Sequence, residues 1–217
     1  MADNNYANLK IQNDEISVVL PFSDSYTTER KYSLEEFFDF AEKNPDLLCE
    51  RNANGKITFM TPVKNLSGHR ESVIGIYVGM WWLNNGEKGI LLSSSTGVRL
   101  KDDSVKSPDS GWISPAGIGE NSAQQIEETF AVMTPDFVVE VRSFSDSLKG
   151  LKKKMETVWM KNGVKLAWLI DAKKETVYIY RQGKSVEIVK GFKGRILSGE
   201  GVMPKFEFPL SKLILKL

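Results

Sequence analysis

The sequence predicts a single layered domain of the α/β or α+β class. Segments with the 3.6-residue period of helices alternate with short runs rich in β-branched and aromatic residues, a pattern typical of helices packed on a sheet. The 217 residues are 41% hydrophobic, which is enough for one core, and no Pro/Gly/Ser-rich linker divides them. Repeats at a fixed spacing are not seen, which excludes solenoids and propellers. We expect an N-terminal extension over residues 1–32 and one domain over 33–217.

Two helices and a hairpin are predicted in the first half. Ser33-Leu34-Glu35-Glu36 has the capping-box pattern and opens an apolar-periodic run, which predicts a helix over 33–44. Asn52-Ala53-Asn54-Gly55 supplies residues that tolerate positive φ between two strand-like runs, so a β-hairpin is expected over 47–60. Apolar residues at helical spacing predict a long, deeply buried helix over 65–82.

The second half alternates strands with one further helix. That helix is predicted over 147–162 and ends at Gly163, a favourable residue just beyond a helix. Strands are predicted at 89–92, 97–100, 109–113, 137–141, 166–171, 176–181 and 185–189. The last three are additional C-terminal strands.

Composition excludes several kinds of site. With 29 basic and 28 acidic side chains the formal net charge is +1, so a polyanion would have to be bound by a local patch. A single cysteine, Cys49, and a single histidine, His69, exclude an internal disulfide and a Cys/His zinc cluster. A metal ion would therefore have to be held by carboxylates. No apolar window is long enough to span a membrane and the start MADNNYANLK lacks signal-peptide features, so we expect a cytoplasmic protein.

Three acidic residues interrupt or flank apolar strands. Glu50 ends the run Leu47-Leu48-Cys49, Asp109 precedes Ser110–Ile113, and Glu140 lies inside Phe137–Val141. A charge that faces a core costs several kcal/mol unless it is paired or binds a cation. Alternation puts Glu140 on the strand face opposite Phe137. The alternative is that each acid lies on a solvated strand face.

Lysines on the following helix add a cation. At about 100° per residue, an apolar stripe runs down one side of the helix, Lys152 and Lys154 fall on its two edges, and Lys153 points to solvent. A lysine at such an edge can return its ammonium group to the end of the preceding strand. Alternatively, the lysines form only a solvated face. Two or three carboxylates with a lysine are the groups that metal-assisted phosphodiester hydrolysis requires.

Several segments, in order along the chain, resemble the putative restriction endonuclease domain family of the PD-(D/E)XK nuclease superfamily. The matching segments are LLCE at 47–50, GKITFMTP at 55–62, SSTGVRL at 94–100, SPD at 107–109, PDFVVEVRS at 135–143 and WLID at 168–171. Their order and spacing extend the resemblance over roughly residues 33–210. It implies a restriction-endonuclease-like core, a mixed β-sheet flanked by helices, and a Mg²⁺-dependent nuclease site in which Mn²⁺ can substitute.

The resemblance also implies roles for particular residues. Asp109 and Glu140 would be the principal metal ligands and Glu50 the third carboxylate. The superfamily's usual lysine position, two residues after the second acid, holds Arg142 here, and Lys154 matches the family's helix lysine instead. Arg142 cannot deprotonate, so it could serve only as an auxiliary electrostatic clamp.

Four other residues are interpreted as structural. Asp136 and Asp171 are expected to act as turn or capping acids, His69 to lie at a surface or helix end, and Cys49 to be a small core residue.

The expected substrate is DNA. Basic residues concentrate in the second half of the chain, where they could follow a phosphate backbone or form a salt-bridged surface. By analogy with restriction-type nucleases we expect a homodimer. The sequence therefore predicts a Mg²⁺-dependent DNA endonuclease. The alternative is a catalytically inactive nuclease-fold protein that binds nucleic acid or protein.

Overall fold

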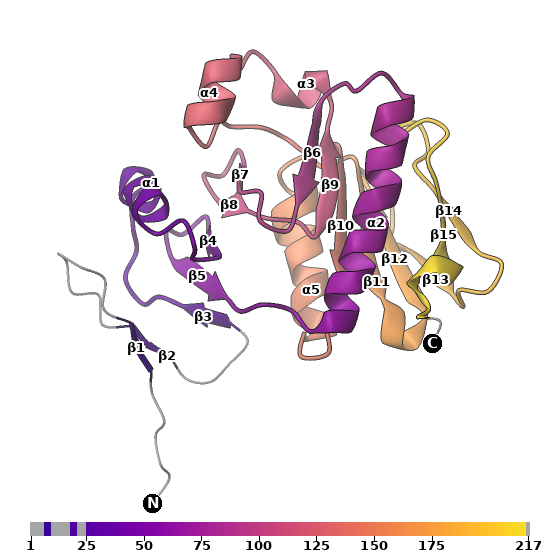
Figure 1. Ribbon diagram of the computed structural model, residues 1–217, viewed down its shortest axis with the longest axis horizontal. Helices are drawn as coiled ribbons and strands as arrows, with labels where there is room; N and C mark the ends of the chain where they lie inside the picture. Colours follow the sequence, from indigo (N-terminus) through magenta and orange to yellow (C-terminus); the bar gives the residue numbers. More distant parts are fainter. Residues whose placement is uncertain (1–6, 10–17, 21–24, 216–217) are drawn as a thin grey trace, which may run out of the picture.

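The structure describes only part of the N-terminal region. The computed structural model describes residues 7–9, 18–20 and 25–215, so much of the predicted extension over 1–32 lies outside the described residues (Figure 1). Strand β1 (Ala7–Leu9) pairs antiparallel with β2 (Val18–Leu20). Strand β3 (Ser25–Thr27) pairs antiparallel with residues 58–60, which belong to a strand of the predicted domain.

A small sheet forms one side of the molecule. Its strand order is β3-β5-β4-β8-β7, with β4 at Cys49–Arg51, β5 at Ile57–Met60, β7 at Val98–Arg99 and β8 at Val105–Lys106. The predicted hairpin is confirmed, because β4 and β5 pair antiparallel across a turn that ends at Gly55 with φ +84°.

Helix α1 (Leu34–Lys43) covers the small sheet, which confirms the first predicted helix. The Ser33 hydroxyl accepts from the Glu36 N–H at 3.1 Å, and the Glu36 carboxylate accepts from the Ser33 N–H at 2.7 Å. Phe37 and Phe40 on its inner face pack in one cluster with Ile57 and the small-sheet residue Val105.

The large sheet is mixed and has six strands in the order β13-β12-β11-β10-β9-β6. The bounds are Ile90–Ser93 for β6, Ser110–Ile113 for β9, Phe137–Val141 for β10, Leu166–Asp171 for β11, Thr176–Arg181 for β12 and Glu187–Lys190 for β13. Strands β10 and β11 are parallel, and the other neighbours are antiparallel. The parallel pair is buried on both faces, as parallel strands require.

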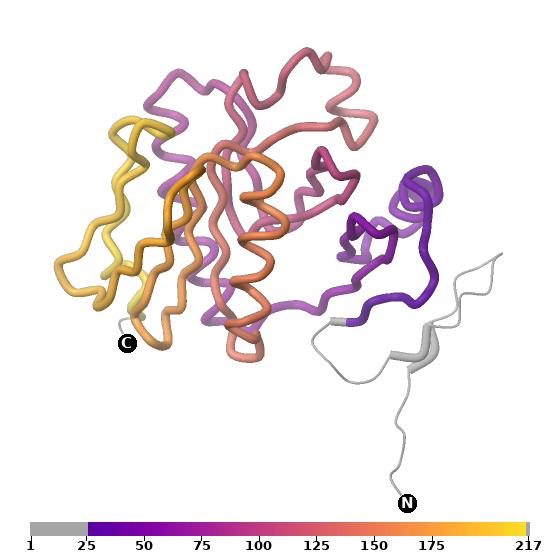
Figure 2. Tube along the Cα trace, turned by 180° about the vertical axis from the view of Figure 1, so that it is seen from behind, coloured from indigo at the N-terminus to yellow at the C-terminus, as the bar shows by residue number. Residues whose placement is uncertain are grey.

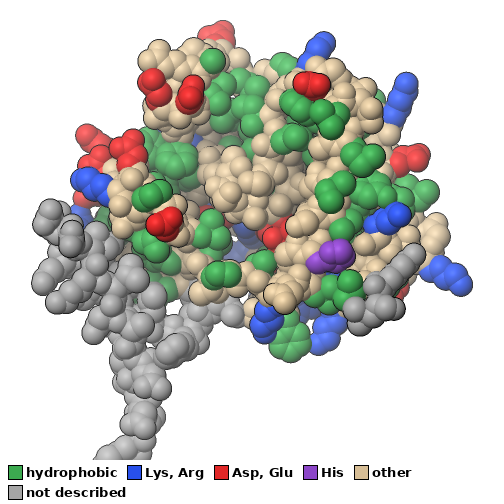
Figure 3. Space-filling model, viewed as in Figure 1, with side chains coloured by type: hydrophobic (Ala, Val, Ile, Leu, Met, Phe, Trp, Pro, Cys, Tyr) green, Lys and Arg blue, Asp and Glu red, His purple; other side chains and the backbone are tan. Residues whose placement is uncertain are grey.

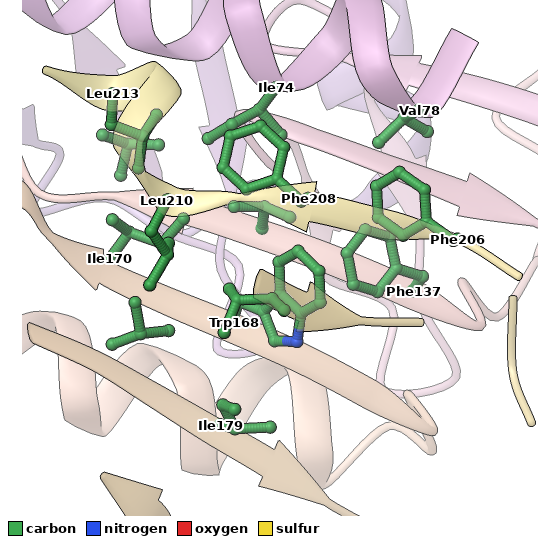
Figure 4. Packing of buried hydrophobic residues seen from close by; sticks show 14 of the residues in the cluster. Ile74, Val78, Phe137, Trp168, Ile170, Ile179, Phe206, Phe208, Leu210 and Leu213 are labelled. Carbon is green, nitrogen blue, oxygen red and sulfur yellow. The ribbon is translucent and has the colours of Figure 1, made fainter. Parts of the chain in front are cut away.

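Helices cover both faces of this sheet, which confirms the predicted fold class. Helix α2 (Asn65–Asn84) lies on one face together with the two-stranded sheet of β14 (Ile196–Ser198) and β15 (Glu207–Pro209), and α5 (Leu148–Lys154) lies on the other (Figures 1 and 2). Figure 4 shows the packing on the α2 side, where Trp168 stacks on Phe206 with ring centroids 5.8 Å apart. Short 3₁₀ turns follow β11 (Ala172–Lys174) and β15 (Leu210–Leu213).

The structure corrects two sequence predictions about helices. Helix α2 was expected to be deeply buried. Only the helix face that carries Ile74, Val78 and Trp81 is buried. Ile76 and Met80 are more than half exposed. The helix predicted over 147–162 is α-helical only through Lys154.

Its remainder, η1 (Met155–Met160), is a π-helix. The Lys161 N–H accordingly donates to the Glu156 carbonyl five residues back at 3.2 Å. Met155 and Trp159, which belong to the apolar stripe predicted for the helix over 147–162, are fully buried.

Two short helices occupy the polar stretch between β9 and β10, where the sequence predicted no element. They are α3 (Pro115–Ile118) and α4 (Ala123–Glu128), and the hydroxyls of Ser114 and Ser122 cap them. In the described part of the chain no helix has both the length and the apolar character needed to cross a membrane.

Candidate functional site

The candidate site lies in a cavity of about 540 Å³ between the small sheet and the large sheet. On the face shown in Figure 3 the surface is hollowed between the small sheet and α2. The cavity is lined by four acidic side chains, Glu71, Asp109, Glu140 and Asp146, and by two lysines, Lys64 and Lys154. The cavity therefore brings together residues far apart in the sequence.

Strand pairing places Asp109 next to Glu140. In the antiparallel register of β9 and β10, Ser110 is opposite Val139, so one further step sets Asp109 opposite Glu140. The Asp109 carboxylate also accepts a hydrogen bond from the Val141 N–H at 2.5 Å. The two acids predicted as metal ligands thus sit side by side at the cavity wall.

Glu140 is buried and held by two donors. Its side chain lies on the α5 face of β10, opposite Phe137, as strand alternation predicts. The Lys154 ammonium lies 2.8 Å from Glu140 Oε1, and the indole N–H of Trp159 donates to the same oxygen at 2.7 Å. A solvated strand face is therefore wrong for this acid.

Glu50 joins the same network from the small sheet. Its Oε1 lies 3.6 Å from Lys154 Nζ and accepts from the Ser107 N–H at 3.1 Å. Its Oε2 accepts from the buried Lys106 ammonium at 2.9 Å, and Lys106 also donates to Asn52 Oδ1 at 2.6 Å. Glu50 is thus buried between two lysines, and Lys154 links the two sheets.

Two residues of this cluster were missed by the sequence analysis. Glu71 of α2 shares the helix face of Ile74 and Val78, so it is a charge on a buried helix stripe and the reasoning applied to strand acids would have found it. Lys106 belongs to a two-residue strand that carries no periodicity signal.

The carboxylates of the cavity destabilise one another's ionised forms. Burial, and then the charges of Glu140 and Glu71, hold the pKa of Asp109 well above its usual range. Burial and the charges of Glu140 and Asp146 raise the pKa of Glu71. Burial likewise raises the pKa of Glu140, although Lys154 opposes this. This part of the cavity has an excess of negative charge.

The lysines have the opposite effect on Glu50. Burial alone would raise its pKa, but Lys154 and Lys106 outweigh burial and lower it. Burial would lower the pKa of Lys154, but the carboxylates of Glu140 and Glu50 raise it instead. Lys154 therefore stays protonated at neutral pH, as a fixed cation and hydrogen-bond donor.

The donor set fits a magnesium ion. Four carboxylates (Glu50, Glu71, Asp109 and Glu140) face two ammonium groups (Lys106 and Lys154), which leaves a formal charge of −2 when all are ionised. Among the described residues no three His, Cys, Asp or Glu side chains form a metal-binding group by themselves. Mg²⁺ does not need one, because it is commonly bound by one or two carboxylates with water and substrate phosphates completing its octahedron.

Arg142 lies outside this network. Its guanidinium pairs with Asp171 at 2.7 Å and donates to the Asp146 carbonyl at 3.0 Å. Of the two candidate cations it is Lys154, not Arg142, that contacts the acids.

The other residues that the sequence singled out are placed in structural roles. Asp136 pairs with Lys165 and accepts from the Ser114 N–H, and Asp171 accepts from the Lys174 N–H at the start of a 3₁₀ turn. His69 is exposed on α2. Cys49 packs on the small-sheet core, where burial and then the charge of Glu50 raise its pKa to about 11, so the thiol stays protonated.

Comparison with known proteins gives a family and a fold. The family described as "Uma2: Putative restriction endonuclease" matches residues 34–211. No protein with a curated description matches the chain. The chain is similar to a crystal structure described as a putative nuclease belonging to DUF820 from Anabaena variabilis ATCC 29413, with a TM-score of 0.68 and 18% identity over 84% of this chain and 97% of the other. At that identity the likeness shows a shared fold alone.

Proposed function

Because this chain belongs to the putative restriction endonuclease family, we propose that it is a Mg²⁺-dependent endonuclease that hydrolyses phosphodiester bonds of DNA. One observation carries the proposal. The adjacent acids Asp109 and Glu140 and the ammonium group of Lys154 face one cavity, and the cluster around them has a surplus of two negative charges when every group is ionised. A divalent cation would neutralise that surplus, and Mn²⁺ would serve as a substitute.

The proposal gives each residue of the cluster a task. Asp109 and Glu140 would hold the ion, with Glu50 as the third carboxylate and Glu71 facing them from α2. When bound, the ion would polarise the phosphoryl oxygens and make a water molecule more nucleophilic. Trp159 and Lys154 fix one carboxylate oxygen of Glu140, which leaves that group little freedom to rotate.

Lys154 would act as an electrostatic group. Its raised pKa means that it cannot accept a proton from the attacking water at neutral pH. Its ammonium instead offers hydrogen-bond donors to a phosphate whose negative charge grows in the transition state. Lys106 pairs with Oε2 of Glu50, whereas Lys154 lies nearer Oε1, so Lys106 would be a positioning residue.

The test combines metal binding with cleavage. Calorimetric titration with Mn²⁺ is expected to show binding to wild type that Asp109→Asn and Glu140→Gln lose. Glu156→Gln, an exposed acid of η1, is the matched control and should bind as wild type does. Cleavage of plasmid and of single-stranded DNA should require Mg²⁺ or Mn²⁺ and disappear in the same two variants. Cleavage that persists in Glu140→Gln would refute the assignment.

The competing function is an inactive nuclease-fold protein that binds nucleic acid. It would be favoured by DNA binding without any metal-dependent cleavage, together with binding that is unchanged in Asp109→Asn.

The homodimer and the cytoplasmic location stay predictions. A dimer would bury apolar surface at the exposed face of α2, where Ile76, Met80 and Leu83 are each more than half exposed. Sedimentation velocity of wild type and of Met80→Lys tests this.

A further inference from the structure

Phe144 is an aromatic side chain held out into solvent at the rim of the candidate site. It is 71% exposed, which is the highest value for a large hydrophobic side chain among the described residues. It lines the same cavity as Glu140 and Lys154, so its ring stands where a substrate would enter. A side chain this exposed buries little apolar surface, so it contributes little to the stability of the domain.

Two lysines from separate segments place their ammonium groups over the ring in cation–π contacts. Lys64, just before α2, has its ammonium 4.8 Å from the ring centroid, and Lys173, after β11, has its ammonium 4.9 Å from it. Both lysines are exposed, and neither belongs to an ion pair in the described part of the chain. On the face shown in Figure 3, basic and hydrophobic side chains lie side by side near the lower end of α2.

The loop that carries Phe144 is braced from both sides. Arg142 donates to the Asp146 carbonyl and pairs with Asp171, while the Ser143 N–H donates to the Asp146 carboxylate at 2.7 Å. These hydrogen bonds hold the backbone of the loop on both sides of Phe144, so little ordering of the loop is needed when a ligand binds. They also give Arg142, which does not contact the acids, a role in shaping the site.

We propose that Phe144 is a stacking platform for an unpaired base of a DNA strand. The exposed lysines Lys64 and Lys173, whose ammonium groups lie over the ring in the free protein, would move off it to contact the phosphates on either side of that base. This rests on the proposed function, because the strand is taken to be the one whose phosphate enters the cavity. Aromatic faces beside cationic side chains are typical of proteins that bind single-stranded nucleic acid.

The geometry selects single-stranded DNA over intact duplex. In a duplex both faces of an internal base are already stacked, so only an unpaired or frayed base can lie on the ring. Phe144 follows Glu140 by four residues, so their Cα atoms are at most ~14 Å apart. A strand covers that distance within about four nucleotides at a rise of 3.4 Å. The stacked base would therefore lie close to the scissile phosphate.

Binding can be measured without cleavage. Fluorescence anisotropy in EDTA would compare a short single-stranded oligonucleotide with a blunt hairpin duplex of the same sequence, using wild type, Phe144→Ala, Phe144→Leu and Phe144→Trp. The single strand is expected to bind roughly 5- to 150-fold more weakly to Phe144→Ala, while hairpin binding changes little. Phe144→Leu should be as weak, because it keeps apolar area but has no aromatic face, and Phe144→Trp should bind as wild type does.

Further variants test the lysines and control for nonspecific effects. Lys64→Met and Lys173→Met should each lower the salt dependence of single-strand binding by about 0.7 in the log–log slope. Ile188→Ala, a half-exposed apolar residue on β13, is the matched control and should change nothing.

The outcomes separate this inference from the proposed function. If wild type cleaves DNA but Phe144→Leu binds single strands as tightly as wild type, the platform is refuted and the nuclease stands. If wild type binds single strands through Phe144 but cleaves nothing with Mg²⁺ or Mn²⁺, the platform stands and the nuclease fails. Equal losses for single strand and hairpin would overturn the platform, and so would unchanged binding in every Phe144 variant, as expected for a protein-binding ring.

Discussion

Replacing Lys154 by methionine is expected to destabilise the protein strongly at neutral pH. The substitution leaves Glu140 and Glu50, both about 95% buried, without the ammonium that lies 2.8 and 3.6 Å from them. With an effective dielectric constant near 20, these two attractions are worth about 6 and 5 kcal/mol before desolvation is subtracted. The desolvation of Lys154 itself offsets part of this attraction.

The net loss of unfolding free energy can be estimated from other buried ion pairs and from the exposure of Lys154. Removing one partner of a buried pair costs about 3–5 kcal/mol, and we take the lower end because the Lys154 side chain is 24% exposed. For a chain of this length ~3 kcal/mol corresponds to a drop in Tm of about 6–12 °C. Lys106 still neutralises Glu50, so most of the loss arises at Glu140.

Thermal unfolding followed by circular dichroism, without added metal ion, measures this. The control is Lys153→Met, on the same helix but solvent-exposed and outside any ion pair of the described residues, which should change stability by less than about 0.5 kcal/mol.

The loss should depend on pH. Most of it arises at Glu140, whose pKa is raised by burial, so this carboxyl is protonated first as the pH falls and no longer needs the ammonium. The smaller share at Glu50, whose pKa is lowered, disappears at lower pH. The deficit of Lys154→Met should therefore shrink below about pH 5. Equal Tm values for Lys154→Met and Lys153→Met at pH 7.5 would refute the reasoning.

Three further predictions concern the same cluster. Without metal, Asp109→Asn should raise the Tm at pH 7.5 by about 2–8 °C, because an acid with a raised pKa lowers stability above its unfolded pKa, and the gain should vanish near pH 4. Trp159→Phe removes the donor to Glu140 Oε1 and should lower cleavage by about 10- to 100-fold, with binding of DNA in EDTA unchanged. Mg²⁺ at ten times its Kd should stabilise wild type by about 1.4 kcal/mol in a thermal shift assay, and Asp109→Asn should show no such gain.

Much of the fold follows from local patterns in the sequence. The capping box of α1, the turn at Gly55 and the alternation in β10 and β11 are short-range signals, and the structure confirms them. The strand β8, by contrast, is two residues long and is fixed by its pairing with β4 and β7, which no local pattern reveals.

The residues of the candidate site are also predicted from local patterns, whereas their contacts are not. Glu50, Asp109, Glu140 and Lys154 were found because a charge in an apolar strand, or at the edge of an apolar stripe, is unusual. In the structure Asp109, Glu140 and Lys154 line one cavity, and Glu50 joins them through its ion pair with Lys154. Local patterns do not reveal whether Arg142 or Lys154 contacts the acids, because the answer depends on long-range contacts: Lys154 meets Glu50, and Arg142 pairs with Asp171, 29 residues away.

Glu50 of the small sheet and Lys154 of helix α5 are far apart in the sequence, which has a consequence for synthesis on the ribosome. Glu50 emerges 104 positions before Lys154, and the chain must complete β10 and α5 before the two can meet. A nascent chain that has not reached α5 already contains Glu50, Asp109 and Glu140, yet none of them has the Lys154 ammonium. Under the proposed function, nuclease activity arises only after α5 has been translated, so chains terminated before that point would be inactive.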